Sequence, residues 1–261
     1  MKSDLMEIIL EKVNLNKPIV FIGLPGIGLV GKIAIDTIVK KTKAKKIGAI
    51  KGSFFPPVVF VEDSGRVRES SDQVYHCKIK NQDFLFIVGD FQPNLNSIES
   101  FPSHYLFAKG LSQFLKKIDA KEIYSFAGIN VGDARITKIP ELYFAVNKFA
   151  KSDKLKTKLK PVAKNTTISG IAGLILSESE KFDLAGTCIL SETSAKIYGD
   201  FESAKALLLF VQDFFEIKID MKEVEEEAKK ISQAFKQVIK ELKKITDSAT
   251  QEPQTKPTYV R

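Results

Sequence analysis

A glycine-rich segment near the start of the chain has the spacing of a phosphate-binding turn. Gly26, Gly28 and Gly31 fit the pattern G-x-G-x-x-G, and they follow an apolar run that predicts a strand. In a dinucleotide-binding unit, an acidic side chain about 20 residues further on binds the ribose. The next expected strand ends at 50–52 without an acid. The dinucleotide pattern is therefore incomplete.

The same glycines also approach the pattern of a P-loop. Gly31 is followed by Lys32, as a P-loop requires, but Ile33 stands where a Ser or Thr hydroxyl would bind magnesium. We therefore interpret Gly26 and its two partner glycines as a structural tight turn that lets a helix begin close to a strand. The alternative is an anion site at the N-terminus of that helix.

The remaining candidates for chemistry do not form a catalytic set. His76 and His104 belong to different expected elements, and no zinc-ligand spacing occurs. The segment 132–135 places Asp133 and Arg135 after an expected strand, where we favour a loop ion pair over part of a binding site. We expect no enzyme activity and assign no catalytic residue, metal ligand or cofactor.

Two cysteines and the lack of a long apolar run indicate the compartment. Cys77 and Cys188 lie in strand-like apolar runs, which favours buried, reduced thiols. No run of about 18 apolar residues is present, so we expect no membrane partner. The first residues carry an acid and lack a signal-peptide pattern. These features predict a cytoplasmic protein.

Lysines give the chain a net charge of +8, and they are clustered. The stretch 148–164 holds seven lysines and one acid. Arginine is scarce there, and aromatic residues are not interleaved with the lysines as in proteins that stack on bases, so nucleic acid is not favoured as a partner. We interpret the stretch as solvated surface, with an acidic protein partner as the alternative.

Apolar periodicity predicts alternating strands and helices. A buried parallel strand at 17–23 and a helix at 29–41 bracket the glycine turn. Asp200 is a predicted N-cap for a strong apolar helix. The pattern favours a three-layer α/β domain with a mixed sheet between helices. The further expected elements are strands at 46–50, 122–129 and 184–190, a hairpin set at 58–88, and helices at 102–117, 137–149 and 201–215.

A heptad pattern marks the C-terminal part. Apolar residues recur in steps of three and four from Met221 to Ile245, which predicts a coiled-coil seam on another helix, in the same subunit or a neighbour. Docking on its own domain is the alternative. The sequence thus divides into a domain at 1–219, this helix at 220–245 and a disordered tail at 246–261. The expected oligomer contacts are Val224, Ile231, Phe235, Val238 and Leu242.

The segment from Ile19 to Asp36, which includes the glycine turn, closely resembles the opening signature of the proteasome assembly chaperone 2 family. Three later stretches agree in order, namely Phe55-Pro56-Pro57, the glycine-containing run 168–176, and 190–192 leading to Asp200. The resemblance covers roughly 18–244. It implies a fold similar to nucleoside phosphorylases and a non-catalytic, homo-oligomeric protein that helps proteasome α subunits assemble.

Some family members carry a C-terminal hydrophobic-Tyr-any-residue tail that enters pockets between α subunits. The present chain ends in Tyr259, Val260 and Arg261, so its tyrosine is third from last and follows Thr258. The resemblance therefore implies α-subunit binding through these three residues, in a shifted register or weakly, and the alternative is that the tail does not bind. The alternative function is a nucleoside- or nucleotide-binding enzyme that uses the turn from Gly26 to Gly31.

Overall fold

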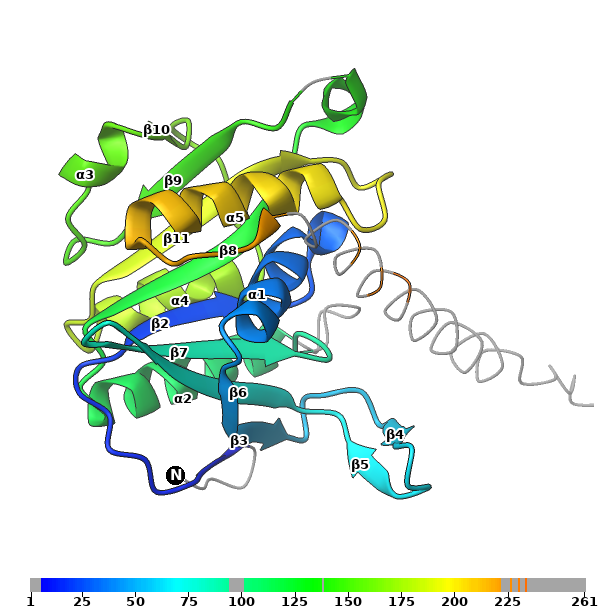
Figure 1. The fold of residues 1–261 in the computed structure, drawn as a ribbon. Helices are drawn as coiled ribbons and strands as arrows, with labels where there is room; N and C mark the ends of the chain where they lie inside the picture. Colours follow the sequence, from blue (N-terminus) through cyan, green and yellow to red (C-terminus); the bar gives the residue numbers. More distant parts are fainter. Residues whose placement is uncertain are drawn as a thin grey trace, which may run out of the picture.

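A nine-stranded mixed sheet forms the centre of the molecule (Figure 1). The computed structural model describes residues 6–93, 101–137 and 139–221, together with 226, 230 and 233. The strand order is β1-β3-β6-β7-β2-β8-β11-β9-β10. These strands are β1 (Met6–Leu10), β2 (Ile19–Gly23), β3 (Lys45–Gly52), β6 (Asp72–Ile79), β7 (Gln82–Gly89), β8 (Glu122–Asn130), β9 (Leu142–Val146), β10 (Lys160–Pro161) and β11 (Gly186–Thr193).

Four parallel strands, β7, β2, β8 and β11, make the middle of the sheet. Antiparallel strands extend it on both sides, with β6, β3 and β1 on one and β9 on the other. Every residue of β2 is buried, as its unbroken apolar run predicts for a strand covered on both faces.

Helices cover both faces of the sheet. Val20 and Ile22 of β2 face one apolar cluster with α2 and α4, whereas Phe21 faces a second cluster with α1 and α5. This arrangement confirms the predicted three-layer mixed α/β fold. The helices are α1 (Val30–Lys41), α2 (Phe101–Lys117), α3 (Asp153–Lys156), α4 (Ile171–Glu180) and α5 (Phe201–Phe215), with 3-10 turns η1 (Ile27–Leu29) and η3 (Gly132–Thr137).

Two segments differ from simple expectation. The helix predicted at 137–149 is wrong, because 142–146 is strand β9, paired antiparallel with β11. A short apolar run does not distinguish helix from strand by period alone, and the unpaired edge of β11 decides the outcome. The expected hairpin set contains a separate two-stranded unit, β4 (Val59–Val61) and β5 (Val67–Glu69), which projects from the body (Figure 1).

None of the helices in the described ranges has the length and apolar character needed to cross a lipid bilayer.

Candidate functional site

The glycine turn joins the carboxyl end of β2 to α1. Gly28 has φ +63°, and a Cβ there would lie 2.4 Å from Thr193 Oγ1. A Cβ on Gly31 would lie 1.9 Å from the carbonyl oxygen of Phe126 in β8. Gly26 is different, because its φ of −155° is extended and the nearest atom to an added Cβ is 3.6 Å away. We infer that Gly28 and Gly31 allow close packing, whereas Gly26 is not sterically required.

The expected strand that ends at 50–52 without a ribose-binding acid is β3, and β3 is not the neighbour of β2 in the sheet. The sheet places β7 next to β2, and β3 lies beyond β6. Asp90 follows β7 directly, so an acid does stand at that position. Both of its oxygens are engaged, since Oδ1 accepts from Arg68 Nη2 at 3.1 Å and Oδ2 accepts from the backbone N–H of Ser71 at 3.1 Å. Asp90 is therefore committed to structural partners.

The lysine after the turn is also committed. Lys32 Nζ lies 2.8 Å from Asp36 Oδ2, one helical turn further along α1. Its side chain is only 13% exposed. An i,i+4 pair of this kind holds the ammonium along the helix surface. This differs from a P-loop lysine, which reaches the phosphates bound at the turn.

A cavity of about 670 Å³ opens at the carboxyl ends of β2 and β8. This is the edge where α/β folds hold ligands. The segments 26–27 and 127–131 form part of its wall, and 166–172 forms another part. Its described lining residues offer amide and hydroxyl groups, including Asn130 and Thr167, but no ionisable side chain. These groups can hydrogen-bond a neutral molecule, and the described part of the wall holds no ionisable side chain that could act as a general base.

The side chain of Gln92 forms hydrogen bonds with both walls of this cavity. Its Oε1 accepts a hydrogen bond from the backbone N–H of Ile171 at 3.0 Å, at the start of α4. Its Nε2 donates to the carbonyl of Pro25 in the glycine turn. A Cβ at Gly170, where φ is +75°, would lie 2.6 Å from Gln92 Oε1. The sequence gives no local signal for this role, because the two contacts are 67 and 79 residues away.

A buried ion pair supports the glycine turn from the other side. Arg135 Nη2 lies 2.6 Å from Asp200 Oδ1, with side chains 7% and 3% exposed. Thr193 Oγ1 donates to Asp200 Oδ2 at 3.0 Å, and the Asp200 N–H donates to the Gly28 carbonyl at 2.8 Å. The predicted N-cap is confirmed, because Asp200 Oδ1 accepts from the N–H of Ser203.

The two charged residues of the 132–135 loop, expected to form an ion pair, each pair with a residue outside the loop. Arg135 pairs with Asp200, whereas Asp133 pairs with Lys196 at 2.8 Å on the surface. The loop, the turn and the start of α5 are joined by these contacts. Since a buried charge is costly without its counter-charge, the network fixes the position of the turn.

The histidines and cysteines lie apart from the cavity lining. His76 Nε2 lies 2.8 Å from Asp83 Oδ1, and His104 is buried in α2. Both cysteines are free, and burial raises the pKa of the Cys77 thiol and raises that of Cys188 to about 12. Cys188 is buried as predicted, while Cys77 is half-buried. Neither thiol has the lowered pKa of a reactive cysteine.

The lysine-rich stretch 148–164 lies at one edge of the sheet and is largely exposed. Acids distant in sequence neutralise part of it. Lys160 Nζ lies 2.9 Å from Glu141 Oε2, Lys148 pairs with Glu180, and Lys158 pairs with Asp213. The cationic field of this edge is therefore weaker than the sequence alone indicates.

The expected oligomer contacts and the tail lie outside the described residues. These are Val224, Ile231, Phe235, Val238 and Leu242 of the heptad seam, and Tyr259, Val260 and Arg261.

Comparison with known proteins gives one family and several similar structures. The model of the PAC2 family matches residues 20–239. A crystal structure of Pyrococcus furiosus PbaB, described as an archaeal proteasome activator, is 25% identical with a TM-score of 0.76, covering 90% of this chain and 99% of that one. Pyrococcus furiosus PbaA, described as an archaeal homolog of proteasome-assembly chaperone, has 20% identity and a TM-score of 0.71, covering 94% and 96%. An uncharacterized protein of Methanocaldococcus jannaschii is 28% identical over 97% of this chain and 95% of its own length.

Proposed function

The chain belongs to the PAC2 family, and on that basis we propose that it is a non-catalytic chaperone or adaptor in proteasome assembly. The observation that carries this proposal is the match to PbaB along nearly the whole of both chains. The PbaA structure, which shares the fold, is described as a homolog of proteasome-assembly chaperone. A fold alone does not assign a function, but a shared family with such members supports one.

The geometry of the cavity agrees with a binding role. Its described lining residues carry no ionisable side chain, and Lys32 beside the turn is paired with Asp36. General acid–base or nucleophilic catalysis needs such a group within hydrogen-bond reach of the reacting atom. These features favour a protein that acts through its surfaces.

We propose further that the partner is the proteasome α subunit and that Tyr259, Val260 and Arg261 contact it. The residues after Ile245 are rich in Ser, Thr, Gln and Pro, so they provide a long tether for the terminal tyrosine. Several tethers on one oligomer would raise the effective concentration of each tail.

A binding assay with purified proteasome α subunits tests this. Full-length protein should bind, and Tyr259→Ala should weaken binding about tenfold or more, as for loss of an aromatic anchor. Thr258→Ala is the matched control and should bind like the unchanged chain. Equal binding by Tyr259→Ala would contradict the tail contact, and no binding by the full-length protein would contradict the proposed function.

We also propose that the protein self-associates through the heptad seam, with Ile231 and Phe235 in a helix–helix contact between copies. Phe235→Asp should lower the particle mass measured by light scattering, because an aspartate in a seam loses apolar burial and adds an unpaired charge. An unchanged mass would show that the seam is not an oligomer contact.

One observation favours a second candidate, a nucleoside-binding function. The cavity of about 670 Å³ has the size of a small-ligand site and lies at the ligand-binding edge of the sheet. Calorimetry with nucleosides, nucleotides and phosphate distinguishes the two candidates. Heat of binding that is lost in Gln92→Ala would support this alternative, and no heat at millimolar ligand would reject it.

A further inference from the structure

The projecting hairpin is a candidate interaction surface that the proposed function does not use. We call residues 58–69 the arm; it contains β4, β5 and the turn between them. In Figure 1 the arm extends away from the sheet beyond β3 and β6. Its turn is closed by hydrogen bonds from Glu62 N–H to the Arg66 carbonyl and from Gly65 N–H to the Glu62 carbonyl, both 2.8 Å.

The two faces of the arm differ in character. Val61 pairs with Val67, Phe60 with Arg68 and Val59 with Glu69. Because successive side chains of a strand point to opposite faces, Phe60 and Arg68 share the inner face. The outer face therefore carries three valines and Glu69. Val59, Val61 and Val67 are 56%, 72% and 64% exposed.

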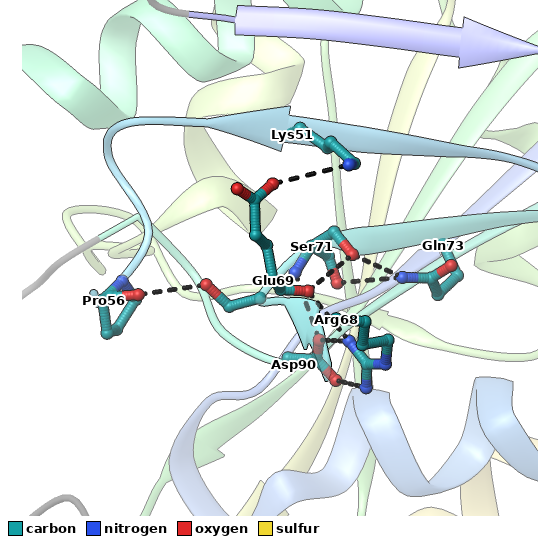
Figure 2. Close-up of polar contacts among 8 residues, drawn as sticks. Lys51, Pro56, Arg68, Glu69, Ser71, Gln73 and Asp90 are labelled. Carbon is teal, nitrogen blue, oxygen red and sulfur yellow. Dashed lines mark hydrogen bonds and ion pairs between the residues drawn. The ribbon is translucent and has the colours of Figure 1, made fainter. Parts of the chain in front are cut away.

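The inner face fixes the arm to the body (Figure 2). The guanidinium of Arg68 makes a two-point contact with the Asp90 carboxylate, with Nη1 2.5 Å from Oδ2 and Nη2 3.1 Å from Oδ1. It also lies 4.3 Å above the Phe60 ring, which stacks on Phe91 at 6.2 Å. Ser70 Oγ donates to the Pro56 carbonyl at 3.0 Å. A surface held this firmly loses little conformational freedom when a partner binds.

Charges lie at both ends of the outer face. At the base, Lys51 Nζ lies 3.4 Å from Glu69 Oε2. Figure 2 shows the two side chains pointing toward each other. At the tip, Glu62, Asp63 and Arg66 are exposed and make no ion pair with any residue that the structure describes. The arm thus presents an apolar centre with charges of both signs at each end.

We propose that the outer face of the arm packs against the same face of a second copy of this chain, with the two arms antiparallel. A two-fold contact brings identical patches together, so the valine centres meet each other. The tip of each arm then lies over the base of the other. This places Glu62 and Asp63 near Lys51 of the second copy, and Arg66 near its Glu69.

The charge of the whole chain favours this region for contact between copies. Two chains of net charge +8 repel each other over most of their surfaces. The arm holds three acids, Glu62, Asp63 and Glu69, against two arginines, Arg66 and Arg68. The arm is therefore a place where two copies can approach with little repulsion. This inference rests on the self-association in the proposed function and adds a second contact, distinct from the heptad seam.

Sedimentation of the full-length protein over a range of concentrations tests the contact. Val61→Lys and Val61→Glu should each raise the dissociation constant for self-association about tenfold or more, since each buries an unpaired charge in an apolar interface. An equal mixture of the two variants should recover self-association, because opposite charges then meet near the two-fold axis. Leu209→Lys, on the exposed side of α5 at 47% exposure, is the matched control and should behave like the unchanged chain.

Fold is checked separately by thermal unfolding at a concentration where all the variants are monomeric, which should not change because Val61 is 72% exposed. A monomeric full-length protein, a Val61 variant that associates normally, or an equal effect of Leu209→Lys would each overturn the proposal. Loss of α-subunit binding by Val61→Lys with unchanged self-association would also overturn it, since the arm would then face another protein. Failure of the α-subunit assay with normal arm behaviour would reject the proposed function alone.

Discussion

Atoms of strands far along the chain decide which positions of the turn require glycine. Gly31 faces the carbonyl of Phe126, and Gly28 faces Thr193. The sequence marks all three glycines equally, because it shows spacing but not neighbours. In the structure, only two of them lie where a side chain cannot fit without movement, and Gly26 lies at the open wall of the cavity.

We therefore predict different outcomes for two alanine substitutions. Gly31→Ala should lower the free energy of unfolding by about 1–3 kcal/mol or more, because its Cβ would overlap backbone that cannot rotate away. Gly26→Ala should be nearly neutral, since its backbone is extended and its nearest neighbour is 3.6 Å away. Urea unfolding of both variants checks this. Equal losses would contradict the packing explanation.

Asp72 is a second residue whose environment is invisible in the sequence. It opens β6 opposite Gly89, and it is fully buried. Neither carboxyl oxygen has a hydrogen-bond partner within the described residues. Burial raises its pKa well above 3.8, the charge of Asp90 adds to this, and Lys32 opposes it. Between pH 3.8 and this raised pKa, Asp72 therefore keeps its proton in the folded protein, whereas the unfolded chain has lost it.

This raised pKa predicts a pH dependence of stability. Asp72 contributes most below pH 3.8, its ordinary pKa, and the contribution is lost as pH rises towards the folded pKa. Asp72→Asn cannot titrate, so its stability should rise relative to the unchanged chain as pH increases. Urea unfolding of both proteins from pH 4 to 8 measures the difference. A constant difference would contradict the prediction, and Asp183→Asn, at an exposed position after α4, controls for loss of a charge.

At the scale of elements, contacts between segments decide what local patterns leave open. The run 142–146 becomes strand β9 because it pairs with β11. Asn147, just after β9, then joins three elements. Its Nδ2 donates to the carbonyls of Leu176 and Leu184 at 3.1 and 2.9 Å, and its Oδ1 accepts from the N–H of Gly186 at 3.0 Å. No sequence pattern distinguishes this asparagine from one in a surface turn.

Asn147→Ala should lower the free energy of unfolding by at least about 2 kcal/mol. It leaves several buried backbone groups unpaired, and each such group costs about 1–3 kcal/mol. Hydrogen exchange should also become faster at the start of β11, where Gly186 loses its acceptor. The control is Thr157→Ala, which removes one exposed local bond and should change stability by less than about 0.5 kcal/mol. Unchanged exchange at Gly186 would count against the bracing role.

At the scale of the molecule, two apolar clusters on opposite faces of one sheet hold the body together. The chain after α5 still belongs to this body. Ile217 and Ile219 are 1% and 7% exposed within the cluster beside α1, and Met221 packs against it. We therefore propose that the domain expected at 1–219 continues to Met221.

Two truncations test this boundary. At a concentration where both chains are monomeric, a chain ending at Met221 should unfold in one transition at the same temperature as the full chain. A chain ending at Glu216 should lose about 3 kcal/mol or more, because burial of each isoleucine contributes about 1.5–3 kcal/mol. Calorimetry of both chains gives the comparison. A lower transition temperature for the chain ending at Met221 would move the boundary further along.

The sequence by itself determined the local elements with strong patterns. The unbroken run of β2, the helical spacing of α1 and the Asp200 cap of α5 are patterns of residues a few positions apart. Such patterns can be recognised in the sequence without knowing the tertiary contacts. The layered α/β class follows from their alternation. The family signature also lies within one continuous segment, from Ile19 to Asp36.

Only the tertiary structure decided which strand lies beside β2, which acid pairs with Arg135, and which face of the arm is left exposed. Each of these depends on pairing between segments tens of residues apart. Strand order and register are set by burial of the whole sheet between two helical layers, not by any local preference. For that reason Asp200, predicted only as a cap, is also the counter-charge of Arg135 and an anchor of the glycine turn.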